Sequence, residues 1–255
     1  NTPEAIFRFL REIGCDQYDF FVCEHLIGHD TNPVSVSEPS DIPDDLSPLN
    51  IVVLKRREDV EKPQFPRPGI PNEFFVPEDD SMVSREHLRW IDLGLLEVSG
   101  EETVWEIGAA TGSVSIESAR LNPEARYYAI EEQEERFHNL CENIRTLETF
   151  NVIPVNEWAS QVLEELPDPD RIFLGGSEGE LDVILPMIDS RLSKGGVVIA
   201  NFITMENLNE TRQFFQQRDY EVNMLQVSLH ESRPLAHYTR WEEGPVLQNV
   251  KAVKK

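Results

Sequence analysis

Residues 103–121, TVWEIGAATGSVSIESARL, constrain the fold of this chain more than any other stretch of its sequence. The stretch opens with a short apolar run at 103–107, which predicts a buried strand. A turn of small residues follows at 108–112, and apolar residues then recur at near-helical spacing through 113–121. A strand, a small-residue turn and a helix form the unit that holds a nucleotide-like ligand at the carboxyl end of a sheet strand.

The turn has the spacing G-x-A-x-G, from Gly108 to Gly112. Glycine is needed where a turn takes a positive φ, or where a ligand lies against bare backbone. The spacing differs from the G-x-G-x-x-G of dinucleotide sites, and Ala110 places a methyl group at the middle position. The turn alone therefore fits an ordinary strand-to-helix connection as well as it fits a cofactor site.

A second apolar strand, at 126–130, ends in Glu131. A carboxylate about 20 residues beyond the glycine turn, at the tip of the next strand, is placed to accept both hydroxyls of a ribose. The alternative is that Glu131 is the first acid of a solvated run, EEQEE at 131–135. Its position at the end of a strand favours the ribose role.

The composition excludes several classes of partner. The chain has 255 residues and a net charge of −24, which argues against non-specific binding to nucleic acid or to anionic membranes, since both need a basic face. No apolar run approaches the ~20 residues that span a membrane. The three cysteines, Cys15, Cys23 and Cys141, lack metal-ligand spacing, so we expect reduced thiols in a cytoplasmic protein, or a half-buried pair near the N-terminus.

The pattern along the chain predicts a small segment followed by a large domain. Residues 1–58 predict one helix, at 3–13, and two strands, at 18–23 and 50–54, which bury too little surface to stand alone. The chain begins with Asn rather than Met, so we expect a fragment or a processed product. Prolines at 62–71 predict a linker or extended arm.

Strands and helices alternate through the rest of the chain, which predicts a doubly wound α/β sheet. Further strands are predicted at 152–155, 171–174 and 197–201, with helices at 84–96, 136–147, 181–192 and 205–217. A polar loop rich in His, Arg and aromatic residues separates two last strands, at 220–229 and 246–253, so we expect an antiparallel final strand. Five parallel strands with a terminal hairpin fit an S-adenosylmethionine methyltransferase better than a dehydrogenase.

Several stretches together resemble one family. They are GIPNEFF at 69–75, MVSREHLR at 82–89, VWEIGAATGSVSIESARL at 104–121, YAIE at 128–131, LPDPDRIFLGGSEGEL at 166–181 and ANFITMENL at 200–208. They resemble the precorrin-6Y C(5,15)-methyltransferase family of cobalamin biosynthesis, in the part that methylates carbon 15 and decarboxylates. The resemblance covers about residues 65 to 255. Residues 1–58 look like the tail of the carbon-5-methylating domain that precedes this part in fused relatives.

The resemblance implies a fold, a cofactor and a substrate. It implies that residues 72–255 form a class I methyltransferase domain with a mostly parallel seven-stranded sheet, after a Pro-rich linker at 59–71 and a domain remnant at 1–58. S-adenosylmethionine is the implied methyl donor, and a precorrin, a reduced tetrapyrrole with carboxylate side chains, is the implied acceptor. The implied reactions are methylation at carbon 15 and loss of carbon dioxide from the acetate on carbon 12. Implied partners are a missing N-terminal methylase domain and further copies of the chain, commonly in a tetramer.

The resemblance also carries cofactor roles to matching residues. Glu131 would hold the ribose, and a backbone group at Ala159 would meet the adenine. Ser84 stands where the family usually has Thr and keeps the hydroxyl, whereas Trp158 departs from the acid often seen there. The strand end and turn that would wrap the methionine part comprise Glu106, Gly108, Ala109, Ala110, Thr111 and Gly112.

Methyl transfer to an electron-rich ring carbon needs positioning and exclusion of water rather than an activated nucleophile. Decarboxylation needs an acid to deliver a proton, and cations must seat the other carboxylates. The expected catalytic residues are His230, Arg233, His237 and Arg85. The expected substrate residues are Gly175, Gly176, Asn201, Thr204 and Arg240.

Each of these assignments has a simpler alternative. A single His is more often a surface or packing residue, an Arg can pair with the acidic surface, and the glycines can form a plain turn. A methyltransferase of the same fold with another small-molecule substrate is an alternative function, and so is a non-catalytic scaffold. Ala110 and Trp158 are the residues that favour the scaffold.

Overall fold

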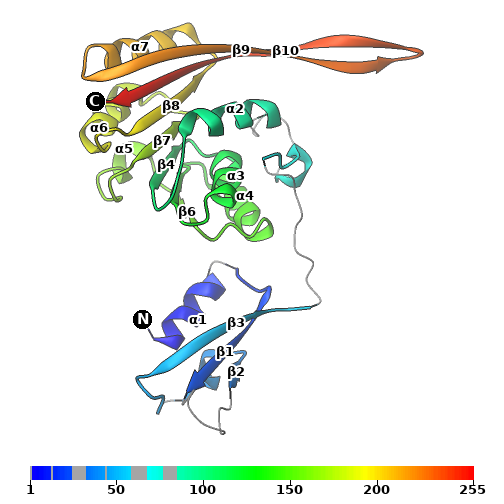
Figure 1. The fold of residues 1–255 in the computed structure, drawn as a ribbon, viewed down its shortest axis with the longest axis vertical. Coiled ribbons are helices and arrows are strands. Elements are labelled where there is room, and N and C mark those ends of the chain that lie inside the picture. Colours follow the sequence, from blue (N-terminus) through cyan, green and yellow to red (C-terminus); the bar gives the residue numbers. More distant parts are fainter. Residues whose placement is uncertain (1, 13, 25–32, 44, 59–67, 77–84) are drawn as a thin grey trace. The chain divides into compact units, whose positions relative to one another are not determined.

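The computed structural model describes residues 2–12, 14–24, 33–43, 45–58, 68–76 and 85–255. The chain divides into two compact units, Asn1–Gln64 and Phe65–Lys255 (Figure 1). Among the described residues, no helix is both long and apolar enough to cross a membrane.

The first unit is a three-stranded antiparallel sheet with one helix. Its strand order is β2-β1-β3, and Phe7 meets Phe20 edge to face in its core, with ring centroids 5.2 Å apart. The predicted helix and both predicted strands are present, but the short strand β2 was not predicted. The elements are α1 (Pro3–Glu12), β1 (Tyr18–Glu24), β2 (Val34–Val36), a 3-10 turn η1 (Pro39–Asp41) and β3 (Asn50–Arg56).

The second unit is built on a seven-stranded sheet with the order β6-β5-β4-β7-β8-β10-β9. The five strands from β6 to β8 run parallel, and β10 is antiparallel to both β8 and β9. This arrangement confirms the α/β fold class and the antiparallel final strand. The strands are β4 (Thr103–Ile107), β5 (Arg126–Ile130), β6 (Val152–Val155), β7 (Arg171–Leu174), β8 (Val197–Phe202), β9 (Tyr220–Leu235) and β10 (Tyr238–Lys254).

Helices bury both faces of this sheet, and successive residues of β4 show why. Trp105 and Ile107 pack in a core with α5, α6 and α7, whereas Val104 packs on the other face with α2, α3 and α4. Side chains alternate between the two faces of a strand, so a strand covered on both sides is apolar throughout. The helices are α2 (Glu86–Leu96), α3 (Ser113–Leu121), α4 (Glu134–Thr146), α5 (Ala159–Val162), α6 (Leu181–Arg191) and α7 (Met205–Gln216), with a 3-10 turn η2 at Asn72–Phe74.

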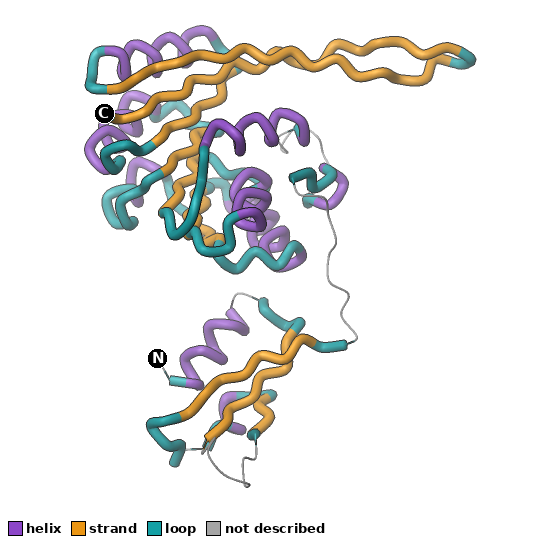
Figure 2. The backbone as a smooth tube through the Cα atoms, viewed as in Figure 1, coloured by secondary structure: helices purple, strands orange, loops and turns teal. Residues whose placement is uncertain are grey.

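Strands β9 and β10 form a ribbon that is longer than the rest of the sheet (Figures 1 and 2). β10 pairs with β8 only over residues 248–253, whereas its pairing with β9 continues to Tyr238 opposite Leu235. The prediction of a polar loop between 229 and 246 was therefore wrong. These residues are largely exposed, so no apolar alternation in the sequence signalled a strand.

A buried ion pair fixes α2 against α3 and the segment before it. Arg89 Nε donates to Glu117 Oε2 over 2.8 Å, and both side chains are almost fully buried. Glu117 Oε1 also accepts from the N–H of Gly69 (2.6 Å), while Arg89 Nη2 donates to the carbonyl of Ile70 (2.5 Å). Because the charges are paired and hydrogen-bonded, their burial is tolerated, and α2 is held in place beside the sheet.

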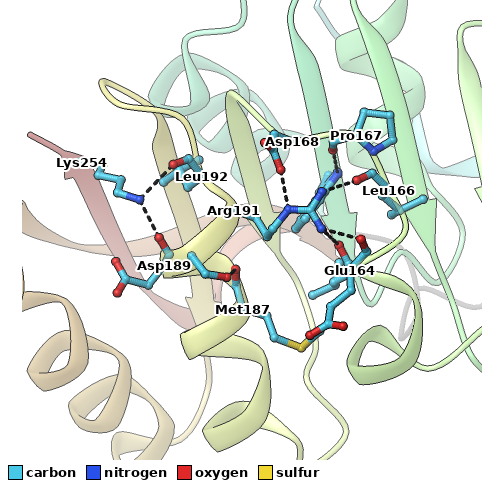
Figure 3. Close-up of polar contacts among 12 residues, drawn as sticks. Glu164, Leu166, Pro167, Asp168, Met187, Asp189, Arg191, Leu192 and Lys254 are labelled. Carbon is cyan, nitrogen blue, oxygen red and sulfur yellow. Dashed lines mark hydrogen bonds and ion pairs between the residues drawn. The ribbon is translucent and has the colours of Figure 1, made fainter.

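Arg191, at the end of α6, binds backbone carbonyls of the loop before β7 through its guanidinium group (Figure 3). Its Nη1 donates to the carbonyls of Leu163 (3.0 Å) and Glu164 (2.7 Å), and its Nη2 donates to that of Leu166 (2.5 Å). Its Nε pairs with the carboxylate of Asp168. These contacts lie before β7, whereas the cavity described below follows that strand, so they support the sheet without entering the cavity.

Candidate active site

A cavity of about 290 Å³ follows the carboxyl ends of the parallel strands. In doubly wound sheets this edge is where ligands bind. The lining residues come from the turns after β4, β5 and β7, from the end of β8, and from α2, α4 and β10. They include Arg85, Leu88, Asp92, Glu106, Gly108, Ala109, Ala110, Ser113, Glu131, Arg136, Phe173, Gly175, Gly176, Glu178, Asn201, Phe202, Ile203 and Leu247.

A smaller hollow of about 10 Å³ adjoins this cavity. Gly108, Gly176 and Glu178 line both spaces, so these residues separate two adjacent hollows. Trp158 and Ala159, at the start of α5, line the smaller one.

The turns after β4 and β7 meet backbone to backbone. Gly108 has a φ of +70°, and a Cβ built there would lie 2.7 Å from the amide nitrogen of Gly176. The N–H groups of Gly175 and Gly176 both donate to the carbonyl of Ile107, over 2.9 and 3.3 Å. A side chain at Gly108 would have to move the neighbouring turn, so only glycine fits this position.

Glu131 is directed at the glycine turn from the end of β5. Its Oε2 accepts the N–H of Ala110 over 2.7 Å, and its Oε1 accepts that of Gln133 over 3.2 Å. Burial raises the pKa of this carboxyl, and the Ala110 N–H opposes the rise. Arg136 Nη1 stands 3.9 Å from Oε1 and 3.4 Å from Glu178 Oε1, so this cation spans two carboxylates at the edge of the cavity.

Glu106 lies beneath the same turn and is almost completely buried. Its Oε2 accepts the N–H of Ser115, in the first turn of α3, over 3.0 Å. Burial raises the pKa of this carboxyl to about 7, against the lowering effect of the Ser115 hydrogen bond. This carboxyl also fixes the start of α3 through its hydrogen bond to Ser115.

A third buried acid, Asp92, lies on α2, and the sequence analysis did not identify it. Its Oδ2 accepts from Asn201 Nδ2 over 2.7 Å, and its Oδ1 accepts from Asn249 Nδ2 over 3.2 Å. Leu88 and Leu96, four residues away on either side, are buried on the same helix face. A lone acid in the middle of an apolar helix stripe was the signal that could have found it.

The structure brings together most of the predicted cofactor residues. Glu106, Gly108, Ala109, Ala110 and Glu131 line the larger cavity, and Ala159 lines the smaller one. Thr111 and Gly112 lie in the same turn without lining either space, and Ser84 lies outside the described residues. Of the predicted substrate and catalytic residues, the larger cavity includes Arg85, Gly175, Gly176 and Asn201.

The other predicted residues lie elsewhere. Thr204 is exposed at the N-cap of α7. Four residues expected in a loop over the cleft are on the β9–β10 ribbon or at its tip, and none of them lines either space: His230, Arg233, His237 and Arg240. Arg233 and Arg240 pair with acids of the ribbon itself. Their catalytic or substrate roles stay predictions.

The residues of the two spaces fit S-adenosylmethionine, which carries a sulfonium and an ammonium group. The acids of the larger cavity that lie near the glycine turn and the turn after β7 can face these positive charges, and they are Glu106, Glu131 and Glu178. The paired oxygens of Glu131 match a ribose diol, and bare backbone at Gly108 and Gly176 allows close approach. Trp158 and Ala159 line the smaller hollow, where the adenine was expected.

Comparison with known proteins assigns the chain to a family. The family described as the precorrin methyltransferase domain matches residues 74–253. A probable cobalt-precorrin-6B C(15)-methyltransferase (decarboxylating) of Pyrobaculum calidifontis is 32% identical over 171 residues, which is 64% of this chain and 86% of that protein. A precorrin-6Y C(5,15)-methyltransferase [decarboxylating] of Mycobacterium tuberculosis is 26% identical over 253 residues, which is 97% of this chain and 62% of that protein.

Solved structures agree with these relatives. A precorrin-6Y C5,15-methyltransferase from Geobacter metallireducens has a TM-score of 0.71 at 29% identity, covering 74% of this chain and 98% of that one. A precorrin 8W decarboxylase from Methanobacterium thermoautotrophicum has a TM-score of 0.66 at 25% identity, covering 71% and 98%. The family match and these relatives together show that this chain is a member of the precorrin methyltransferase family.

Proposed function

We propose that this protein transfers the methyl group of S-adenosylmethionine to carbon 15 of a precorrin, and that it releases the carboxyl of the carbon-12 acetate as carbon dioxide in cobalamin biosynthesis. The observation that carries the proposal is the cavity at the glycine turn. It combines the bare backbone of Gly108 with the buried carboxylate of Glu131, inside the stretch that matches the family.

The bound cofactor supplies an electrophilic methyl group, and the chain holds the reacting partners in line. Glu131 would accept the ribose hydroxyls, and the backbone at Gly108 and Ala110 would hold the methionine part. The nucleophile is a ring carbon of the substrate, so the protein contributes orientation and exclusion of water. Apolar side chains on the β8 and β10 side of the cavity, Phe202, Ile203 and Leu247, face the tetrapyrrole.

The carboxylates of a precorrin need local cations, because a chain with a net charge of −24 repels an acidic substrate over longer distances. Arg85, at the N-cap of α2, and Arg136, on α4, are the arginines that line the cavity. Guanidinium groups bind carboxylates in bidentate pairs, so these two residues are the proposed seats for substrate carboxylates.

We also propose that the protein is a homo-oligomer, with a tetramer as the expected form. The β9–β10 ribbon exposes large apolar side chains, and a two-stranded ribbon by itself is marginally stable in water. These side chains are Met224, Leu225, Leu235, Tyr238 and Trp241. Light scattering should show an oligomer that the double substitution of Tyr238 and Trp241 by Ser weakens; a monomeric wild type would contradict this proposal.

Residues 1–58 form most of the first unit, and they resemble part of a longer enzyme. We propose that residues 1–58 belong to the carbon-5-methylating domain of a fused enzyme, since the alignment with the mycobacterial relative covers 97% of this chain. Apolar side chains on β3, at Ile51, Val53 and Leu54, are exposed and available to the rest of such a domain. The proposed location is the cytoplasm, and the free state of all three cysteines supports it.

The test is calorimetric titration of the purified chain with S-adenosylhomocysteine. Glu131→Gln removes the charge that receives the ribose, and a hydrogen bond to a charged group contributes about 1.5–3 kcal/mol, so affinity should fall roughly 10- to 100-fold. Glu135→Gln makes the same change at an exposed site on α4 and should leave affinity unchanged. Equal affinity of the wild type and Glu131→Gln would refute the ribose assignment, and a wild type that does not bind would favour the scaffold.

A further inference from the structure

Asp92 occupies an unusual place for a carboxyl group. It lies on the buried face of α2 between Leu88 and Leu96, is 1% exposed, and lines the larger cavity. A buried acid on an apolar stripe is costly unless it is neutral, paired with a cation or functional. The strands packed under α2 supply the two side chains that bind it, Asn201 from β8 and Asn249 from β10.

No cation neutralises this carboxyl among the residues that the structure describes, since no Lys, Arg or His forms an ion pair with it. Both of its contacts are to amide N–H groups, and Asn249 Nδ2 also donates to Asn201 Oδ1 over 2.8 Å. The titratable groups that share the cavity are Arg85 on the α2 side, Glu106 on β4, Glu131 after β5, Arg136 on α4 and Glu178 after β7. Burial raises the pKa of Asp92 to about 7, and the two amides oppose the rise.

The decarboxylation of the proposed function creates a need for such a group. When the acetate loses carbon dioxide, its carbon–carbon bond breaks and the electron pair stays on the methylene carbon, shared with the conjugated ring. A proton must then form a new carbon–hydrogen bond to give a methyl group. A general acid works best when its pKa is close to the working pH, because it then holds a proton and can also release it.

We propose that Asp92 donates this proton, and that the amides of Asn201 and Asn249 hold the carboxylate that it leaves. This inference rests on the proposed function. In the step, the Asp92 carboxyl proton passes to the methylene carbon, the substrate loses one negative charge with its carboxyl, and Asp92 gains one. Solvent returns a proton to Asp92 before the next turnover, so the step needs no oxidant, reductant or further reactant.

The other buried acids of the cavity accept hydrogen bonds from backbone N–H groups rather than from side-chain amides. Glu106 holds the N–H of Ser115 beneath the glycine turn, and Glu131 holds those of Ala110 and Gln133. Glu106 lies near the end of β4 and Glu131 directly after β5, on the side assigned to the cofactor. Asp92 lies beside β8 and β10, where the cavity is lined by apolar side chains that suit a tetrapyrrole.

The first experiment separates the two reactions in the full chain, with Asp92→Asn as the test variant. Transfer of tritium from methyl-labelled S-adenosylmethionine measures methylation, and mass spectrometry measures whether the product keeps its carboxyl. The variant should methylate at a rate within about 3-fold of wild type, whereas decarboxylation should slow by roughly 10²- to 10⁴-fold. Asp182→Asn, at an exposed site on α6, is the matched control and should change neither rate.

Equal loss of both reactions would assign Asp92 a structural role, and normal decarboxylation would exclude it as the donor; either result overturns the inference. Failure of the wild type to methylate or decarboxylate would instead refute the proposed function, and the inference with it.

A second variant tests the same point if Asp92→Asn does not fold. The decarboxylation rate should fall as pH rises through about 7, because the acid must be protonated. Asn249→Ala removes an N–H that stabilises the ionised carboxylate, so this alkaline limb should move to higher pH. A limb that stays in place would overturn the inference, because a residue that only packs the helix would not move it.

Discussion

Arg191 offers a direct test of how the loop before β7 is held. The change to Met removes the guanidinium but keeps a long apolar side chain over the same surface. Three backbone carbonyls, of Leu163, Glu164 and Leu166, lose a charged donor, and the exposed carboxylate of Asp168 loses its partner. The Asp168 pair contributes only about 0–1 kcal/mol, because that side chain is 65% exposed.

The three carbonyl contacts decide the size of the effect. Hydrogen bonds from charged donors contribute about 1.5–3 kcal/mol each when buried, but the Arg191 side chain is 24% exposed, so water replaces part of each contact. About 1 kcal/mol per contact gives a loss of about 3 kcal/mol for Arg191→Met. For a domain of this size that lowers the melting temperature by roughly 6–12 °C. Arg191→Lys keeps the charge and reaches fewer carbonyls, so it should lose about half as much.

Urea unfolding followed by circular dichroism measures these differences, with Arg212→Met as the control. Arg212 is partly exposed on α7 and donates an exposed hydrogen bond to Gln216, so its loss should stay within about 0.5 kcal/mol. Affinity for S-adenosylhomocysteine should not change in any of the three variants. A loss below 1 kcal/mol for Arg191→Met would show that water replaces these hydrogen bonds without cost, which would refute the reasoning.

Three further predictions concern the glycine turn and the buried acids. Gly108→Ala places a Cβ 2.7 Å from Gly176 N, so calorimetry should show at least a ~10-fold loss of S-adenosylhomocysteine affinity; unchanged affinity would mean that the two turns can separate. Ala110 has a φ of +49°, a left-handed conformation that strains an alanine. Ala110→Gly should raise the free energy of unfolding, measured in urea, by about 0.5–1 kcal/mol, because relief of this strain exceeds the added entropy of the unfolded chain. A loss of stability would contradict this. Burial raises the pKa of Glu106 and Asp92 to about 7, from ordinary values of 4.5 and 3.8, so the folded state holds more protons between these limits. Stability should therefore fall as pH rises from about 4 to about 7, and Asp92→Asn should flatten that slope in unfolding curves; an unchanged slope would place the titration elsewhere.

The alternation of strands and helices was predictable because the central strands are buried on both faces. Runs such as 103–107 and 171–174 are mostly apolar, and a glycine follows each of them. Pro154 also placed β6 at the edge, where the structure has it, because a proline cannot donate to a neighbouring strand. These signals depend on neighbouring residues only, so they can be read from a single sequence.

The ribbon and Asp92 depend on contacts that a local pattern does not contain. Residues 230–243 have no regular apolar alternation, so the evidence for a strand there is its pairing with the partner strand. Asp92 interrupts an apolar helix face, but its partners, Asn201 and Asn249, are more than a hundred residues away. The glycine turn was identified from the sequence because Gly108 and Gly112 adopt a positive φ, which glycine favours.

The backbone contact between Gly108 and Gly176 has a consequence for how tightly a cofactor can be held. The backbone between the two spaces consists of Gly108 and Gly176, and hydrogen bonds to the carbonyl of Ile107 fix the turn that contains Gly176. This backbone has no side-chain rotamers that ligand binding would restrict. Ordering a flexible side chain on binding costs about 0.5–1.5 kcal/mol, and the Gly108 and Gly176 backbone avoids that cost. This backbone is rigid before the ligand binds, so most of its contact energy contributes to the affinity.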